Sequence, residues 1–375
     1  CFRSGHLWPD HPCSTPSACL RVLCTMADGE ETSSAVGEQP KCFDRYALTL
    51  YCMFPLTQLA AASTTAVAAM VLSGPRLRAA FLAYLVWAWC LDNSPQRGGF
   101  GLFWRLGITH RLRGAFVWRW AARYFPVSMK PTASLPASAG PYIFVCHPHG
   151  IFGISPMTHF GTDATDFTNA FPDVPVHLLG HSAIFRIPFF REWCLAHGHG
   201  SVDRKTCLTL LQKGHSIALA PGGAKESLEC KPRTMRLILA NRKGFAKLAL
   251  RTGAALVPVL AFGENELYST VQFEPGTLSR RIQEALQRRL GFALPLFCGR
   301  KWLPLLPKRR PVSTVVGAPL RPPPGAGAPP AGGFAVEPAQ EVVAEFHKQY
   351  CQALQELFDA HKAAHGAADM QLEIV

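Results

Sequence analysis

Two apolar runs stand near the beginning of the chain, and a short break separates them. Residues 47–72 contain no charged side chain, and a helix of about 20 apolar residues is long enough to cross the hydrocarbon core of a bilayer. Residues 79–91 form a second, shorter run, and the sequence Ser-Gly-Pro-Arg at 73–76 lies between the two. This pattern predicts a membrane hairpin over residues 41–95, in which Pro55 kinks the first helix.

The segment 96–130 follows the hairpin and combines arginines with aromatic residues. Six arginines lie between residues 97 and 123, whereas the turn of the hairpin carries only Arg76 and Arg78. Because positive charge stays on the cytosolic side of a membrane, we expect the bulk of the protein in the cytosol. The stretch 116–125 is typical of a helix that lies in the headgroup layer of a membrane. A nucleic-acid-binding surface and an ordinary core helix are the alternatives, and the upstream hairpin favours the membrane interpretation.

Residues 131–375 alternate short apolar runs with amphipathic stretches, which is typical of an α/β domain. The apolar runs predict buried strands at 142–146, 216–220, 255–262 and 312–316. One helix is expected between an Asp203 cap and Gly214, and a second over 243–251. A last helix near the end of the chain has an apolar face, and the Pro/Gly/Ala tract 322–333 is expected to be a loop. The predicted domain is an αβα sandwich.

Composition and charge narrow the range of partners. The chain is 48% hydrophobic and carries a formal net charge of +13. The apolar content directs attention to a membrane, and the charge favours anionic partners: phospholipid headgroups, nucleotide phosphates or nucleic acid. The 13 cysteines are scattered and include no C-x-x-C pair, which indicates reduced thiols facing the cytosol rather than a disulfide framework.

The first 40 residues are set apart from the fold. Met26 is the first methionine, so the residues before it are interpreted as an extraneous extension or a fragment of a longer chain. Residues 27–39 are polar and acidic and show no apolar period, which predicts a disordered tail.

The element His147-Pro148-His149-Gly150 follows the first predicted strand. The carboxyl end of a strand in an α/β fold exposes side chains to a crevice, and imidazole is a suitable general base near neutral pH. Such a base takes the proton of a hydroxyl group while its oxygen attacks a carbonyl carbon, and no covalent enzyme intermediate is needed. Structural histidines in a turn and a metal shared by His147 and His149 are the alternatives. Further ligands for a metal would come from His177, His181, His197 and His199.

Two further elements are candidates for substrate binding. Gly222 and Gly223 follow a predicted strand, and glycines let backbone N–H groups approach an oxyanion or a phosphate. Glu226, three residues on, is a candidate for orienting a histidine; a plain turn with a solvated glutamate is the alternative. Lys243, Lys247 and Arg251 recur every four residues and form a basic stripe on one helix. The stripe suits coenzyme A phosphates, an anionic membrane or simple solvation equally well.

Six blocks in a fixed order carry a family resemblance that runs from about Tyr46 to the end of the chain. They are YIF with HPHG at 142–150, FP at 171–172 with FRIP and RE at 185–192, GGA with ES at 222–227, RKGF at 242–245, LVPV at 256–259, and FGENE at 262–266. In these blocks the chain resembles the type-2 diacylglycerol acyltransferase family, which includes monoacylglycerol and wax-alcohol acyltransferases.

The resemblance implies a membrane enzyme of the endoplasmic reticulum and of lipid droplets, with its catalytic domain in the cytosol. It implies transfer of a fatty acyl group from acyl-CoA to the free hydroxyl of diacylglycerol, which forms triacylglycerol. Acyl-CoA is then a co-substrate, and no cofactor, metal or nucleic acid is expected. Monoacylglycerol or a wax alcohol as the acceptor, a catalytically silent lipid-droplet scaffold, and assembly as a homo-oligomer stay open.

The more distantly related glycerol-phosphate acyltransferases place an aspartate five residues after a catalytic histidine. Here Phe152 and Ile154 stand five residues after His147 and His149, so that pair is absent. Asp163 and Glu226 are the candidates for the missing carboxylate. The resemblance favours His149 as the base, with His147 as the alternative. The residues expected to contact substrate are Gly150, Gly222, Gly223, Arg242, Lys243 and Lys247.

Overall fold

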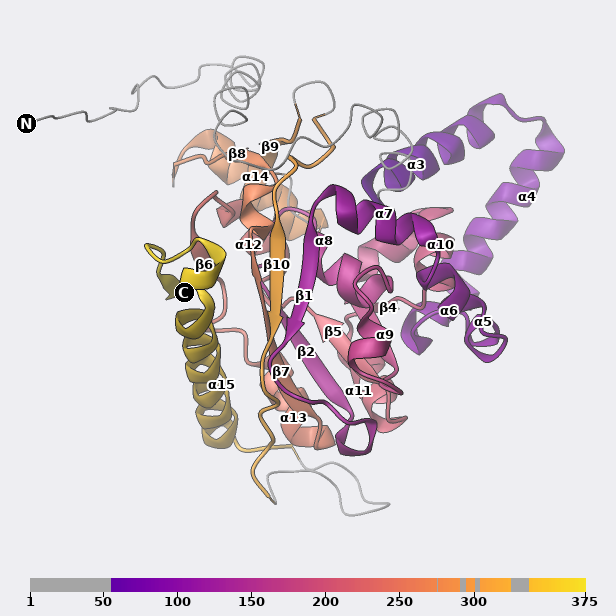
Figure 1. Ribbon diagram of the computed structural model, residues 1–375. Coiled ribbons are helices and arrows are strands. Elements are labelled where there is room, and N and C mark those ends of the chain that lie inside the picture. Colours follow the sequence, from indigo (N-terminus) through magenta and orange to yellow (C-terminus); the bar gives the residue numbers. More distant parts are fainter. Residues whose placement is uncertain (1–54, 275, 291–294, 301–303, 325–336) are drawn as a thin grey trace, which may run out of the picture.

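A mixed seven-stranded sheet runs through the centre of the protein (Figure 1). The computed structural model describes residues 55–274, 276–290, 295–300, 304–324 and 337–375. In spatial order the strands are β1 (Val127–Pro131), β10 (Val312–Val316), β7 (Ala255–Phe262), β2 (Tyr142–His147), β5 (Ser216–Leu219), β3 (Val176–Gly180) and β4 (Gly200–Ser201). The strands from β7 to β4 are parallel, and β10 joins β7 in the antiparallel sense.

Helices cover both faces of this sheet. One face packs against α11 (Arg204–Gln212), α13 (Gly244–Thr252) and α15 (Gln340–His361), with Ile143 and Val145 of β2 in the shared core. On the other face, η4 (Met157–Gly161) and α9 (Phe167–Ala170) bring Phe160 and Phe167 against Phe144. Because both faces are covered, β2 is a continuous apolar run rather than an alternating one. The expected α/β fold class is confirmed.

Smaller elements complete the described chain. The short strands β6 (Met235–Leu237) and β11 (Leu372–Ile374) pair with each other, as do β8 (Ser269–Val271) and β9 (Leu296–Cys298). Six short helical elements lie around the sheet: α7 (Phe116–Tyr124), α8 (Ile154–Pro156), η5 (Ser182–Arg186), α10 (Phe190–Ala196), α12 (Gly223–Glu229) and η6 (Glu264–Glu266). Three further helices lie at the periphery: α5 (Gly101–Arg105), α6 (Ile108–Arg113) and α14 (Leu278–Leu290).

The four predicted strands and the three predicted helices are confirmed. One detail is wrong, because Asp203 stands at the start of α11 without a side-chain capping bond and instead accepts a hydrogen bond from Ser201 Oγ at 2.5 Å. The edge strands β1 and β4, and β3 beside β4, were not predicted. Because β1 begins at Val127, the sheet starts inside the segment 96–130 that the sequence assigned to the membrane interface. The tail at 1–40 and most of the tract 322–333 lie outside the described residues.

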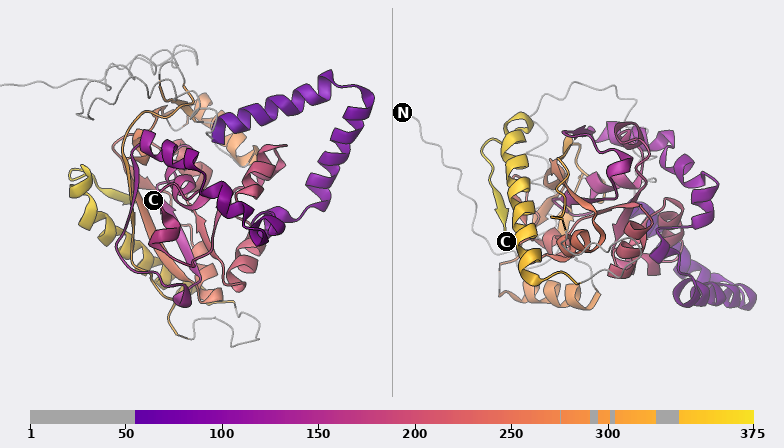
Figure 2. Two further views of the ribbon diagram at one scale, coloured as in Figure 1. Left: turned by 45° about the vertical axis from the view of Figure 1, so that its right-hand side comes forward. Right: turned by 90° about the horizontal axis from the view of Figure 1, so that it is seen from below.

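Two helices joined by a sharp turn occupy the place of the predicted hairpin. α3 (Pro55–Leu72) and α4 (Pro75–Val86), which continues as the π-helix η1 (Trp87–Leu91), form a V that projects from the sheet (Figure 2). Gly74 separates them, and Pro75 takes the first helical position, where its missing N–H costs nothing. Within the described residues, no helix combines the length and the apolar character needed to cross a membrane. The structure has two helices in this region, and the membrane hairpin stays a prediction.

Large apolar side chains are exposed on the hairpin and on α7. Leu72 is 83% exposed and Leu91 66%, and on α7 the ring of Phe116 is 71% exposed while Trp118 is buried. Exposed apolar patches of this kind mark surfaces that contact lipid or another protein. α3 and α10 also enclose an apolar pocket of about 220 Å³, lined by Ala61, Ala62, Thr65, Phe189, Phe190 and Trp193.

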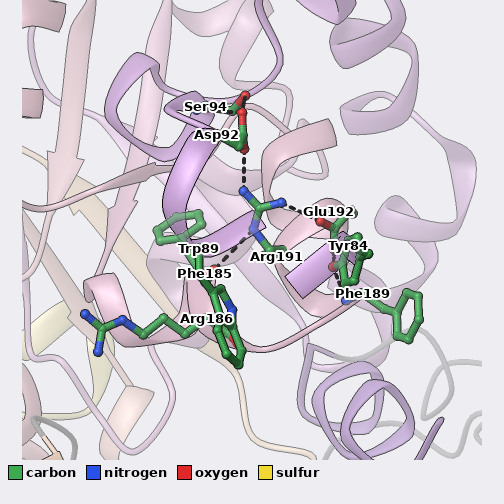
Figure 3. A network of polar contacts seen from close by, with 9 residues as sticks. All are labelled: Tyr84, Trp89, Asp92, Ser94, Phe185, Arg186, Phe189, Arg191 and Glu192. Carbon is green, nitrogen blue, oxygen red and sulfur yellow. Dashed lines mark hydrogen bonds and ion pairs between the residues drawn. The ribbon is translucent and has the colours of Figure 1, made fainter. Parts of the chain in front are cut away.

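Arg191 of α10 attaches the hairpin to the rest of the protein (Figure 3). Its fully buried guanidinium forms an ion pair with Asp92, which directly follows η1, and a second with Glu192, at 2.6 Å between Nη1 and Oε1. Glu192 also accepts a hydrogen bond of 2.8 Å from Tyr84 Oη on α4, and Arg191 Nε donates to the carbonyl of Phe185 at 3.2 Å. These directional contacts define how α4 meets α10.

Replacing Arg191 by methionine should destabilise the protein strongly. Arg191→Met leaves Asp92 and Glu192 without their cation, and removing one partner of a buried pair costs about 3–5 kcal/mol. Arg186→Met is the matched control, because Arg186 is exposed and contributes only its carbonyl to the network, to Trp89 Nε1 at 3.1 Å. Thermal unfolding of the purified proteins in detergent measures both. An equal unfolding midpoint for Arg191→Met and the wild type would contradict the anchoring role.

Candidate active site

Three segments that are far apart in the sequence meet at one edge of the sheet. β2 ends at His147 between its parallel neighbours β5 and β7, so the loops that follow these three strands leave from the same edge. The loop after β2 carries the rest of the His-Pro-His-Gly element, the loop after β5 leads into α12, and the loop after β7 leads into η6. The topology therefore brings the predicted motifs together.

His149 lies in the loop directly after β2, and its ring is held from one side. Nδ1 is 3.0 Å from the carbonyl oxygen of Gly150 and 2.9 Å from Oγ of Ser227 on α12. A carbonyl oxygen only accepts hydrogen bonds, so Nδ1 carries the proton and Nε2 carries the lone pair. In the described part of the chain, no residue forms a hydrogen bond with Nε2, and the side chain is half-buried. The imidazole thus presents a basic nitrogen on the side away from Ser227.

Glu226 is buried, and it holds the backbone of His149 rather than its ring. Oε1 accepts a hydrogen bond of 2.5 Å from the His149 N–H, and Oε2 accepts one of 2.9 Å from the N–H of Ile238. Burial raises the pKa of the Glu226 carboxyl, and the hydrogen bond from His149 and the nearby charge of Arg242 oppose that shift. Glu226 therefore meets the candidate base, as the sequence predicted, but through the main chain.

His147 is fully buried and turned toward α15. Its Nε2 lies 2.9 Å from Oη of Tyr350, and its Nδ1 has no hydrogen-bond partner among the described residues. Burial lowers the pKa of His147 to about 3, so the ring is neutral at physiological pH. The Nε2 atom of His147 is already bonded to Tyr350, and the whole ring is buried, as in a histidine with a structural role. Of the two histidines, His149 is therefore better situated for proton transfer.

Asp163 lies apart from His149. Its backbone N–H donates to the carbonyl of Arg113 at 2.9 Å, and its Oδ1 accepts from the N–H of Thr168 at 3.0 Å. Arg113 is buried, and its guanidinium donates to the carbonyls of Phe160 and Val176. Burial lowers the pKa of Arg113 to about 10, and the charge of Asp163 opposes that shift. No described contact joins Asp163 to His149, so of the two predicted carboxylates only Glu226 contacts His149.

The predicted glycines have different surroundings. Gly150 has a φ of +63°, and a Cβ there would lie 2.7 Å from Oε1 of Glu264, so both its backbone conformation and its surroundings require glycine. Gly222 is packed against the carboxylate of Glu226, and Gly223 begins α12 with open space beside its Cα. Gly150 and Gly222 thus bring the chain close to two buried glutamates.

The basic stripe on α13 is partly neutralised. Lys247 and Arg251 both form ion pairs with Glu337, and Arg204 of α11 adds a third contact at 3.0 Å. Arg242 and Lys243 are exposed directly before α13, and the charge of Arg242 acts on Glu226. An anion at the candidate site would therefore meet Arg242 and Lys243 rather than the whole predicted stripe.

Three residues of the site were not predicted: Ser227, Tyr350 and Glu264. Ser227 stands next to Glu226 in a block that was recognised, so the signal was present and its role was missed. Tyr350 was assigned only to the apolar face of the last helix, and Glu264 only to a block. For the alternative of a metal shared by His147 and His149, the structure offers no set of ligands. The described residues contain no group of three or more His, Cys, Asp or Glu side chains that could hold a metal ion.

Comparisons with known proteins agree with the predicted resemblance. A family model described as diacylglycerol acyltransferase matches residues 70–375. Diacylglycerol O-acyltransferase 2A of Umbelopsis ramanniana is 38% identical over 291 residues, which cover 75% of this chain and 77% of that protein. Diacylglycerol O-acyltransferase 2 of Danio rerio is 38% identical over 304 residues, which cover 79% of this chain and 78% of that protein. Diacylglycerol O-acyltransferase 2 of Homo sapiens is 37% identical over 300 residues, which cover 78% of this chain and 72% of that protein.

A solved structure is also similar in part. The 1-acyl-sn-glycerophosphate acyltransferase of Thermotoga maritima aligns with 81% of this chain and 97% of its own, at 12% identity and a TM-score of 0.33. At this level of similarity, the likeness carries no argument about the fold.

We expect acid to destabilise the protein through its buried histidines. His147 has a pKa of about 3 in the fold, whereas an unfolded histidine takes up its proton near pH 6.5. The unfolded state therefore binds more protons between these values, and each such histidine lowers the free energy of unfolding by up to about 1.4 kcal/mol per pH unit as the pH falls.

The variant His147→Gln keeps a polar partner for Tyr350 but has no titrating proton, so it should show a shallower pH dependence. His181→Gln is the control, because His181 is exposed in the fold. Urea unfolding in detergent between about pH 4 and 7 measures the slope. Identical slopes in the wild type and in His147→Gln would contradict a buried neutral imidazole.

Proposed function

Because this chain belongs to the diacylglycerol acyltransferase family, we propose that it transfers a fatty acyl group from acyl-CoA to the free hydroxyl of diacylglycerol, forming triacylglycerol. Family membership makes the chain an O-acyltransferase. The observation that supports His149 as its base is the pair of contacts at Nδ1, which leave Nε2 free to accept a proton.

The reaction needs one base and no covalent enzyme intermediate. His149 Nε2 takes the hydroxyl proton of diacylglycerol while the hydroxyl oxygen attacks the thioester carbonyl carbon. The tetrahedral intermediate then collapses, the carbon–sulfur bond breaks, and the imidazolium returns the proton to the leaving thiolate of coenzyme A. The acceptor gains the acyl group and loses one proton, and coenzyme A leaves as the free thiol.

The neighbouring residues have supporting roles in this proposal. Glu226 fixes the main chain of His149, and Ser227 fixes the ring by accepting from Nδ1 together with the Gly150 carbonyl. Backbone N–H groups at Gly222 and Gly223 are candidates for stabilising the thioester oxyanion. Arg242 and Lys243 are candidates for holding the phosphates of coenzyme A, because both side chains are exposed and the charge of Arg242 acts on Glu226.

The proposal places the substrate in a lipid surface. The exposed apolar side chains of α3, α4 and η1, together with Phe116 and Trp120 of α7, are suited to the endoplasmic reticulum membrane or to a lipid droplet. Exposed Arg119 and Arg123 beside them on α7 are suited to anionic headgroups on the cytosolic side.

Removing the His149 imidazole should abolish turnover while the protein stays folded. We expect His149→Ala to lower the rate of ester formation at least about a hundredfold, the usual contribution of a general base. His181→Ala, at an exposed histidine, should keep full activity. Membranes from cells that express each protein would receive radiolabelled acyl-CoA with diacylglycerol, monoacylglycerol or a long-chain alcohol in parallel.

Triacylglycerol formation by the wild type and not by His149→Ala is the expected result. An ester made only from another acceptor would correct the substrate. Full activity in His149→Ala would exclude it as the base, and the absence of any ester, with folded wild-type protein in the membrane, would favour a scaffold.

Arg242 and Lys243 should affect the binding of acyl-CoA more than Lys247 does. We expect Arg242→Ala and Lys243→Ala each to raise the KM for acyl-CoA roughly threefold, and less at high salt, because exposed ionic contacts are weak and screened. Lys247→Ala is the matched control on the same helix, since Glu337 already pairs with Lys247. An increase in KM for Lys247→Ala alone would place the phosphates along the stripe instead.

A further inference from the structure

Glu264 is a second buried glutamate beside the loop that carries His149. It belongs to η6, directly after β7, and both of its carboxylate oxygens accept hydrogen bonds from the main chain of α8. Oε1 accepts from the N–H of Ile154 at 2.8 Å, and Oε2 accepts from the N–H of Ser155 at 2.9 Å. The sequence placed Glu264 in a recognised block but gave it no role.

We propose that Glu264 is a positioning residue for the acyl transfer, because its carboxylate fixes the far end of the loop that presents His149. This inference rests on the proposed function of His149. Glu226 binds the near end of the loop at the His149 N–H, and Glu264 binds the far end at Ile154 and Ser155. The segment between these two attachments contains Gly150, which lies against the Glu264 side chain.

The sheet register explains why Glu264 reaches this loop. β7 pairs in parallel with β2, and Leu260 of β7 lies opposite His147. Glu264 follows Leu260 by four residues, so both strands deliver their next residues to the same edge of the sheet. The chain can turn at Gly263 because this residue has a φ of +93° and lies against the Pro311 carbonyl, where no Cβ fits.

The far end of the loop is tied to the sheet by a second set of contacts. Ser155 Oγ lies 3.1 Å from Thr314 Oγ1 on β10, and Thr314 Oγ1 lies 2.7 Å from Nε2 of the buried His159. Glu264 therefore holds one end of the loop to a fixed part of the protein, so a change in its carboxylate would be transmitted along the loop to the segment with Gly150 and His149.

The chemistry of Glu264 makes its hydrogen bonds hard to replace. No cation of the described chain forms an ion pair with it, and burial raises the pKa of Glu264 to about 7 despite the two N–H donors. A glutamine in its place offers one oxygen and one NH₂ group, and the NH₂ would face an N–H donor. Glu264→Gln thus keeps the size of the side chain, loses one hydrogen bond and creates a donor–donor conflict.

The test compares Glu264→Gln with Glu266→Gln in the full chain. Glu266 lies in the same turn, but its Oε1 accepts from the N–H of Arg233 at 2.6 Å, away from the His149 loop. We expect Glu264→Gln to lower kcat about tenfold or more, as a displaced catalytic group does, while the KM for acyl-CoA changes by less than about twofold. Glu266→Gln should match the wild type in both constants.

A second measurement reports on His149 directly. Modification by diethyl pyrocarbonate, followed by mass spectrometry, gives the reaction rate of each histidine in wild type and variants. We expect the rate at His149 to change in Glu264→Gln and the rate at exposed His181 to stay the same. This readout separates displacement of the loop from a general loss of stability, which thermal unfolding measures in parallel.

The outcomes separate the inference from the function on which it rests. A wild type that forms no ester from any acceptor overturns the proposed function. An active wild type together with a Glu264→Gln variant of equal kcat and equal His149 reactivity overturns the positioning role. If Glu264→Gln does not accumulate in membranes, Glu264→Asp decides, because it keeps both acceptor oxygens but withdraws them by one methylene; wild-type kcat in that variant would also overturn the role.

Discussion

The hydrogen bond from the His149 N–H to the Glu226 carboxylate, 2.5 Å long, is the contact on which the geometry of the candidate site depends. It joins the loop after β2 to α12, and the other oxygen of Glu226 joins α12 to the chain after β6. Charge-assisted hydrogen bonds are stronger than neutral ones, and burial increases that difference. The carboxylate therefore stabilises the main chain, while a neutral hydroxyl and a carbonyl orient the imidazole. Among the described residues no carboxylate meets Nδ1, so in the proposed reaction the imidazolium would be less stabilised and would return its proton readily to the departing thiolate.

The sequence was sufficient for the buried strands and for the position of the candidate base, because both depend on local pattern. β2, β5, β7 and β10 are continuous apolar runs, and the His-Pro-His-Gly element follows the first of them. It was not sufficient for contacts made through space. Ser227, Tyr350 and Glu264 act on residues 78, 203 and 110 positions away, and no spacing rule relates them. The stripe on α13 was predicted from its period, yet Glu337, which pairs with Lys247 and Arg251, stands 86 residues after Arg251 and left no local signal.

The junction between the hairpin and α10 shows how an element with an apolar outer surface is kept in a fixed orientation. Apolar contacts are non-directional. If they alone held the hairpin, its helices could rotate relative to the part of the protein on which they pack. Arg191 adds direction, because its planar guanidinium has fixed donor positions and is met by Asp92, Glu192 and the Phe185 carbonyl. The apolar side chains of the V are thereby left on its outer surface, where lipid is proposed to lie.

The pairing of β1 with β10 has a consequence for the synthesis of the protein. The two strands lie side by side, with Ser128 opposite Ser313, although 185 residues separate them in the chain. At a translation rate of roughly 5–20 residues per second, β1 leaves the ribosome about 10–40 seconds before β10, its one neighbour among the described strands, exists. During that interval the other strands of the sheet from β2 to β7 are already made, but β1 has no strand to pair with. An unpaired strand beside the exposed aromatic side chains of α7 is prone to aggregate, so the nascent chain would benefit from shelter until β10 arrives.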